Sequence, residues 1–166
     1  MSVQAVADAI EQLENHRITI TGGEPLLQEP AIIELIDELT RRNARYDFNI
    51  ETNGTIIPSF HRDNVWFTYD YKTPSSLAEE AMNLDIFKVA TPADIIKFVV
   101  GSMQDLDRMN EILKTYPTDA QIFVSPVWGN IEGATIVDYM KAHDWQNVRF
   151  QLQIHKFIWD PDAKGV

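Results

Sequence analysis

The residues best suited to chemistry lie in short polar clusters that follow predicted strands. The first cluster is Thr21-Gly22-Gly23-Glu24-Pro25. Its two glycines allow the backbone to approach a ligand closely, and the Glu24 carboxylate can accept hydrogen bonds from an ammonium group. A tight turn between a strand and a helix, with Pro25 near the helix start, explains the same residues. By composition alone this turn is the better explanation.

Two further clusters follow the next predicted strands. Glu51-Thr52-Asn53-Gly54-Thr55 contains the turn dipeptide Asn-Gly, but a turn does not explain a carboxylate and two hydroxyls at one strand end. Residues 70–76 include Asp70, Lys72 and three hydroxyls. A site for a polar ligand and a solvated loop explain that third cluster equally well. A fourth cluster, residues 125–129, is best explained as a turn with a half-exposed tryptophan.

The fifth cluster is Gln151-Leu152-Gln153-Ile154-His155-Lys156, near the end of the chain. Polar and apolar residues alternate, which predicts that Gln151, Gln153 and His155 share one face of a strand. Burying such groups without partners would cost about 1–3 kcal/mol each. A lone histidine is more often structural than functional, but three such groups on one face favour a function.

The elements that must position these clusters alternate between strands and helices. Hydrophobic spacing predicts a helix over 3–13 capped by Ser2, and a helix opened by Pro30 with a buried stripe from Ile32 to Leu39. It also predicts helices over 106–113 and 134–142, and strands over 17–21, 46–50, 65–69, 95–100, 122–124 and 148–154. The nearly continuous apolar run over 95–100 predicts a strand that is covered on both faces.

Repeated βα units of this length predict one α/β domain over residues 1–166 with a parallel sheet. Ligands of such folds bind at the carboxyl ends of the strands, where the polar clusters lie.

The composition narrows the class of function. The 166 residues are 45% hydrophobic and 23% charged, and their net charge of −11 argues against a general nucleic-acid binder. No apolar run approaches the roughly 20 residues of a membrane span, and no targeting segment opens the chain. We therefore expect a cytoplasmic protein. The chain has no cysteine, which excludes disulfides, thiolate catalysis and cysteine-ligated metal sites built from these residues alone.

Taken together, the clusters resemble one family of radical S-adenosylmethionine enzymes. Gly22-Gly23-Glu24-Pro25 is similar to the motif with which these enzymes hold the amino group of the cofactor's methionine. The order of the later clusters, and the ending Gln151 to Asp160 and then Gly165-Val166, resemble the 7-carboxy-7-deazaguanine synthases of queuosine and deazapurine biosynthesis. The resemblance runs from about Ile18 to Val166.

The resemblance implies an incomplete, partial TIM-type parallel βα barrel. It also implies a carbon–nitrogen lyase that converts 6-carboxy-5,6,7,8-tetrahydropterin to 7-carboxy-7-deazaguanine with loss of ammonia. The family uses S-adenosylmethionine, a [4Fe-4S] cluster and Mg²⁺, and tends to be dimeric. The resemblance implies which residues bind each ligand. Those expected to bind the cofactor are Gly22, Gly23, Glu24, Glu51, Asn53, Asp70 and Lys72. Those expected to bind the substrate are Gln151, Gln153, His155 and Val166.

Two departures from the family stand out. Many members carry Ser-Pro-Lys where this chain has Asp70-Tyr71-Lys72. Members also begin with a strand and a loop whose three cysteines ligate the cluster, followed by a Thr that helps to bind Mg²⁺. We therefore expect a fold without its first strand and cluster loop, an exposed sheet edge, no metal ligands and no turnover by the isolated chain.

Three readings remain open from the sequence. The chain is a truncated enzyme, or an enzyme whose missing part is a separate partner chain. Alternatively, it is a catalytically dead binding or regulatory protein that retains the S-adenosylmethionine or pterin pocket. The third possibility is an unrelated α/β protein whose motifs agree by chance. Agreement at several strand ends in family order argues against the third reading.

Overall fold

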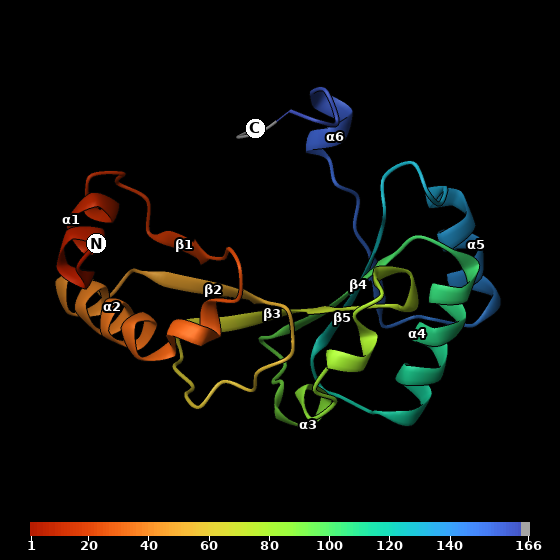
Figure 1. Ribbon diagram of the computed structural model, residues 1–166, viewed down its shortest axis with the longest axis horizontal. Helices are drawn as coiled ribbons and strands as arrows, with labels where there is room; N and C mark the ends of the chain where they lie inside the picture. Colours follow the sequence, from red (N-terminus) through yellow and green to blue (C-terminus); the bar gives the residue numbers. More distant parts are fainter. Residues whose placement is uncertain (164–166) are drawn as a thin grey trace.

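Six parallel strands form one sheet in the computed structural model of the chain, which describes residues 1–163 (Figure 1). The strands are β1 (Arg17–Ile20), β2 (Asp47–Thr52), β3 (Val65–Tyr71), β4 (Ile95–Val100), β5 (Gln121–Pro126) and β6 (Val148–Phe150). They lie in the sheet in sequence order, each parallel to the next. This is the wall of a parallel βα barrel that does not close, so the predicted fold class is confirmed.

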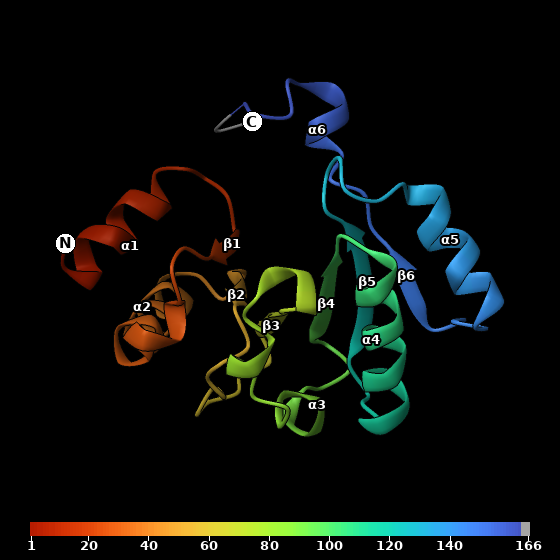
Figure 2. The same ribbon diagram turned by 45° about the vertical axis from the view of Figure 1, so that its right-hand side comes forward.

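All but the last of the helices lie on the outer side of this curved wall. They are α1 (Val3–Glu11), α2 (Glu29–Arg42), α3 (Ile86–Val89), α4 (Met103–Thr115), α5 (Gly133–Ala142) and α6 (His155–Ile158). Figure 2 shows α1 to α5 around the convex side of the sheet, whereas α6 lies apart from them, beyond the carboxyl ends of β5 and β6. Across residues 1–163, every helix is too short or too polar to cross a membrane.

The core lies between the sheet and the outer helices. Along each strand alternate side chains point outward, and from β2, β3 and β4 these include Phe48, Phe67 and Phe98, each at most 1% exposed. They pack with helical residues such as Ile36 and Leu106 in one hydrophobic cluster. Burying each such side chain stabilises the fold by about 1.5–3 kcal/mol. The inward-pointing residues form the concave face, which we define as the side of the sheet opposite α1 to α5.

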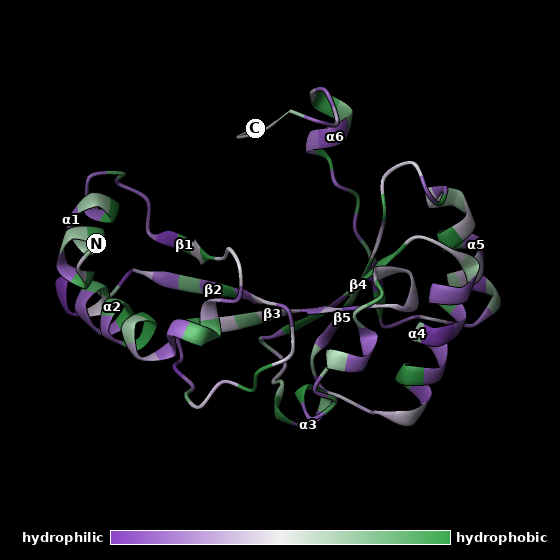
Figure 3. Cartoon of the chain, in the orientation of Figure 1, coloured by the Kyte–Doolittle hydropathy of each residue, from purple (hydrophilic) through white to green (hydrophobic). Residues whose placement is uncertain are grey.

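Two of the helices begin at serine caps that the sequence supplies. The Ser2 hydroxyl accepts a hydrogen bond from the Ala5 N–H and caps α1, and the Ser102 hydroxyl caps α4 by accepting from the Asp105 N–H. Pro30 lies in the first turn of α2, as predicted. In Figure 3 hydrophilic and hydrophobic residues alternate along α2 and α4, as expected of helices with one buried face.

The structure corrects three details of the prediction. Asp70 belongs to β3 rather than to the loop that follows it. The strand over 95–100 is buried on one face only, because Ile95, Lys97 and Val99 remain partly exposed on the concave face. The last strand ends at Phe150, so residues 151–154 are not a strand.

The predicted sheet edge is present in the described part of the chain. β1 pairs only with β2 there, and its Arg17 and Thr19 are exposed.

Candidate functional site

Glu24 ties the carboxyl ends of β1 and β2 together. Its Oε1 accepts hydrogen bonds from the Thr52 hydroxyl at 2.7 Å and from the Leu26 N–H at 3.1 Å, and its Oε2 accepts from the Asn53 N–H at 2.8 Å. Thr52 is 2% exposed, so its bond to the carboxylate is shielded from water. A carboxylate can accept about four hydrogen bonds, so Oε2 keeps room for one more donor.

The two glycines before Glu24 leave the backbone open beside this carboxylate. Gly22 and Gly23 have φ angles of +97° and +57°, which only glycine adopts easily. A Cβ atom added at either position would meet no other atom within 4 Å. Both residues are exposed, and their peptide groups are therefore accessible to a ligand at the strand end.

Glu51, Asp70 and Lys72 lie at the ends of the neighbouring strands. Glu51 is exposed, and the Thr21 hydroxyl lies 3.5 Å from its Oε2. Lys72 Nζ lies 3.6 Å from the Oδ2 of Asp70, and both side chains are about one third exposed. The predicted cofactor residues of β1, β2 and β3 therefore lie at adjacent strand ends, although only Glu24 and Asn53 share a hydrogen bond.

The hydroxyls that follow β3 hold the loops of the fold together. Thr73 donates to the Val99 carbonyl at 3.0 Å, and Ser76 donates to the Thr73 carbonyl at 2.6 Å. The buried carboxylate of Asp105 accepts from the N–H groups of Gly101 at 2.7 Å and Ser75 at 2.9 Å. Burial pushes the pKa of Asp105 up, but these hydrogen bonds outweigh it and hold the pKa below its usual value.

The predicted substrate residues lie at the far edge of the sheet. Gln151 and Gln153 follow β6, and His155 opens α6, so the prediction that the three share one face of a strand is wrong. The alternation misled because Leu152 and Ile154 are 41% and 63% exposed and have no core to enter. Val166 lies outside the described residues.

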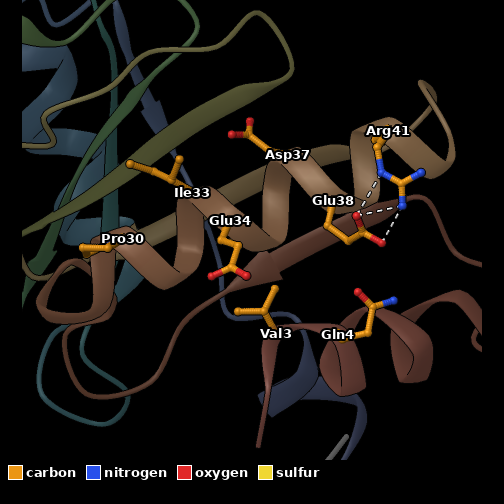
Figure 4. A pocket seen from close by; sticks show the side chains of 8 residues that line it. All are labelled: Val3, Gln4, Pro30, Ile33, Glu34, Asp37, Glu38 and Arg41. Carbon is orange, nitrogen blue, oxygen red and sulfur yellow. Dashed lines mark hydrogen bonds and ion pairs between the residues drawn. The ribbon is translucent and has the colours of Figure 1, made fainter.

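A groove between α1 and α2 lies away from these strand ends (Figure 4). Glu34, Asp37, Glu38 and Arg41 line it, and Glu38 binds Arg41 at 2.8 Å. Hydrogen bonds from Arg42 and Arg41 hold the pKa of Glu38 below its usual value. Arg42 also binds Asp8 and Glu11 of α1, so these charges join the two helices.

Comparison with curated proteins identifies the family of the chain. The 7-carboxy-7-deazaguanine synthase of Clostridium acetobutylicum is 38% identical over 100% of this chain and 76% of its own length. The synthase of Leptospira interrogans is 36% identical over 100% of this chain and 74% of its own length. This chain belongs to the 7-carboxy-7-deazaguanine synthase family. The synthase of Methanospirillum hungatei is 36% identical over 95% of the chain and 64% of its own length. No family model matches the chain.

The metal chemistry of the synthase family has no ligand set in this chain. The sequence contains no cysteine. Across residues 1–163, no three His, Asp or Glu side chains come together in a way that could hold a metal ion. These residues therefore supply no thiolate for an iron–sulfur cluster.

Two residues that contribute to the open side and the strand ends of the sheet were not singled out from the sequence. Thr52 was part of a predicted cluster, but its bond to Glu24 depends on the pairing of β1 with β2 and carries no local signal. Lys97 lies on the concave face in the middle of β4. The feature of the sequence that could have identified it is a single lysine within an otherwise apolar strand.

Proposed function

We propose that this chain forms the cofactor- and substrate-binding part of a 7-carboxy-7-deazaguanine synthase, acting as one domain. The reaction is the radical ring contraction of 6-carboxy-5,6,7,8-tetrahydropterin, a carbon–nitrogen lyase step of queuosine and deazapurine biosynthesis. The observation that carries the proposal is the Glu24 carboxylate, which is fixed between two strand ends beside two open glycines.

The strand ends of β1 to β3 have the chemistry to hold S-adenosylmethionine. Glu24 has one free acceptor position for the ammonium group of the methionyl end, and the peptide groups of Gly22 and Gly23 lie open beside it. Glu51, Asn53, Asp70 and Lys72 offer further donors and acceptors at the adjacent strand ends. When bound to an active enzyme, the cofactor supplies the adenosyl radical that abstracts a substrate hydrogen.

The other end of the sheet has the chemistry to recognise a pterin. Gln151, Gln153 and His155 offer amide and imidazole groups that match the donors and acceptors along the edge of such a ring. No described side chain forms a hydrogen bond with any of the three. Val166 stays a prediction for this substrate site, as do the homodimer and the cytoplasmic location.

The cluster must obtain its ligands from outside these 166 residues, because they contain no thiolate. The isolated chain is therefore expected to make no product. The test is anaerobic iron–sulfur reconstitution of the purified chain, followed by an assay for 7-carboxy-7-deazaguanine. The expected result is no product above a protein-free control, and product from the chain alone would contradict the inactivity.

The same absence of cysteine also suits a second function, a regulatory protein that binds S-adenosylmethionine or the pterin. The intact mass of the protein purified anaerobically from its source distinguishes the two. A mass well above 19.0 kDa, or a co-purifying cysteine-rich partner, supports the enzyme. A mass equal to this chain without such a partner supports the regulator.

A further inference from the structure

Lys97 places a positive charge in the middle of the concave face. It lies on β4 between Ile96 and Phe98, which point outward and are both 0% exposed. Side chains alternate along a strand, so Lys97 points to the open side of the sheet, where it is half-buried.

Lys97 forms no ion pair with the described side chains around it. Its partner in the register on β3 is Asp70, whose carboxylate already lies 3.6 Å from Lys72. Its partner on β5 is Phe123. None of the ion pairs or side-chain hydrogen bonds found over residues 1–163 includes Lys97. Arg149, the next cation on this face, instead binds Gln121 at 2.7 Å and lies over the Phe123 ring.

A buried hydroxyl without a partner lies on the same face nearby. Ser125 of β5 is 1% exposed, and its Oγ has no hydrogen-bond partner among the described residues. Ser125 is next to Val99 in the register, two residues beyond Lys97 on β4. Lys97 and Ser125 therefore present an ammonium group and a hydroxyl at neighbouring positions of the sheet, and these two donors suit an anion.

The charge of the concave face differs from that of the whole chain. Acidic residues outnumber basic ones by 25 to 14 in the sequence. The inward positions of the strands, in contrast, carry as many basic as acidic side chains: Arg17, Lys97 and Arg149 against Asp47, Glu51 and Asp70. These inward positions therefore lack the excess of negative charge that the chain has on average, which favours an anionic ligand there.

We propose that Lys97, assisted by Ser125, binds a carboxylate of the ligand. The inference rests on the proposed function and adds a specificity residue to it. Two ligands of that function carry a carboxylate, the deazapurine or its pterin precursor and the methionyl end of S-adenosylmethionine. The methionyl carboxylate is on the same carbon as the ammonium group that Glu24 is proposed to bind at the ends of β1 and β2. Lys97 lies two strands from β2, about 10 Å at about 4.8 Å between neighbouring strands, so its position favours the carboxylate of the ring ligand.

The test compares matched ligands with and without a carboxylate, by equilibrium dialysis against the full chain without metal. The pairs are 7-carboxy-7-deazaguanine with 7-deazaguanine, and S-adenosylmethionine with its decarboxylated form. We expect the wild-type chain to prefer 7-carboxy-7-deazaguanine by about 10- to 100-fold, the range of a charge-assisted hydrogen bond. Lys97→Gln should reduce this preference to less than about 3-fold, and Ser125→Ala should reduce it less.

Lys114→Gln is the matched control, because Lys114 is an exposed lysine on the outer helix α4. It should retain the wild-type preference. Loss of the preference within the S-adenosylmethionine pair instead would support a carboxylate role for Lys97 and identify the cofactor as its source. Unchanged preferences in Lys97→Gln and Ser125→Ala would overturn the inference and leave the proposed function standing. Failure of the wild-type chain to bind any of the four ligands would overturn both.

Discussion

The two ends of the sheet hold their polar side chains in different ways. At β1 and β2, Glu24 is fixed by three hydrogen bonds from Thr52, Asn53 and Leu26. Beyond β6, Gln151 and His155 are exposed, and their described hydrogen bonds are made by the main chain alone. The Gln151 N–H donates to the Val124 carbonyl of β5, and the His155 carbonyl accepts from the Trp159 N–H at the end of α6. The first end is organised before a ligand arrives, whereas the second presents side chains that are free to turn.

This difference indicates how the two ends contribute to binding. A carboxylate that is already oriented loses little conformational entropy on binding. The first end is therefore suited to one ligand of fixed structure, such as a cofactor. The free amides of the second end must be ordered by their ligand. Changes at the first end should therefore affect stability and binding together, and changes at the second end should affect binding alone.

The largest expected effect is that of Glu24→Ala. The substitution leaves the buried Thr52 hydroxyl and the Asn53 N–H without their acceptor, so the free energy of unfolding should fall by about 2–4 kcal/mol. Binding of S-adenosylmethionine should weaken by at least about 10-fold. Urea unfolding and titration calorimetry measure the two effects. Glu34→Ala, an exposed change on α2, is the control for both. Unchanged calorimetry in Glu24→Ala would remove Glu24 from the cofactor site.

A smaller effect is expected at Asp105, which fixes the loops after β3 and β4. Asp105→Asn replaces a charged acceptor of two N–H bonds and should lower the free energy of unfolding by about 2 kcal/mol at pH 7.

The loss should depend on pH in a defined direction. Because the fold lowers the pKa of Asp105, its contribution is complete above the unfolded pKa of about 3.9 and is lost as pH falls through the folded pKa. Denaturant unfolding from pH 7 to pH 3 should show the wild type and Asp105→Asn converging. A difference that grows on acidification would contradict this role.

The smallest effect on stability is expected beyond β6. His155→Ala and Gln153→Ala remove side chains without described partners, so the free energy of unfolding should change by less than about 0.5 kcal/mol. Binding of 7-carboxy-7-deazaguanine should weaken by about 3- to 10-fold, since each side chain supplies one hydrogen bond. Thermal unfolding and equilibrium dialysis measure the two effects. A variant that loses stability but binds normally would reverse the distinction between the two ends.

The sequence predicted the sheet because its strands are short apolar runs separated by turn residues. It also placed Glu24 at a strand end correctly, since Gly22 and Gly23 must interrupt β1. The tail was predicted wrongly because polar and apolar residues alternate there without a core to bury Leu152 and Ile154. Alternation predicts a strand only where one face is buried.

Other parts of the site could not be predicted because they depend on contacts between distant residues. The acceptor role of Asp105 joins loops that are 4 and 30 residues away from it. The sequence does not show which residues lie beside Lys97. Its neighbour Asp70, whose carboxylate lies 3.6 Å from Lys72, is known only from the register of β3 and β4. Neither relationship leaves a local pattern in the sequence.

The central claim is that the organised strand ends of β1 and β2 hold S-adenosylmethionine. The most direct measurement is a titration of the metal-free, ¹⁵N-labelled chain with S-adenosylmethionine, followed through its amide NMR signals. We expect the largest shifts at Gly22, Gly23, Glu24 and Asn53, with little change along the groove between α1 and α2. Shifts concentrated in that groove, or no shifts at millimolar cofactor, would contradict it.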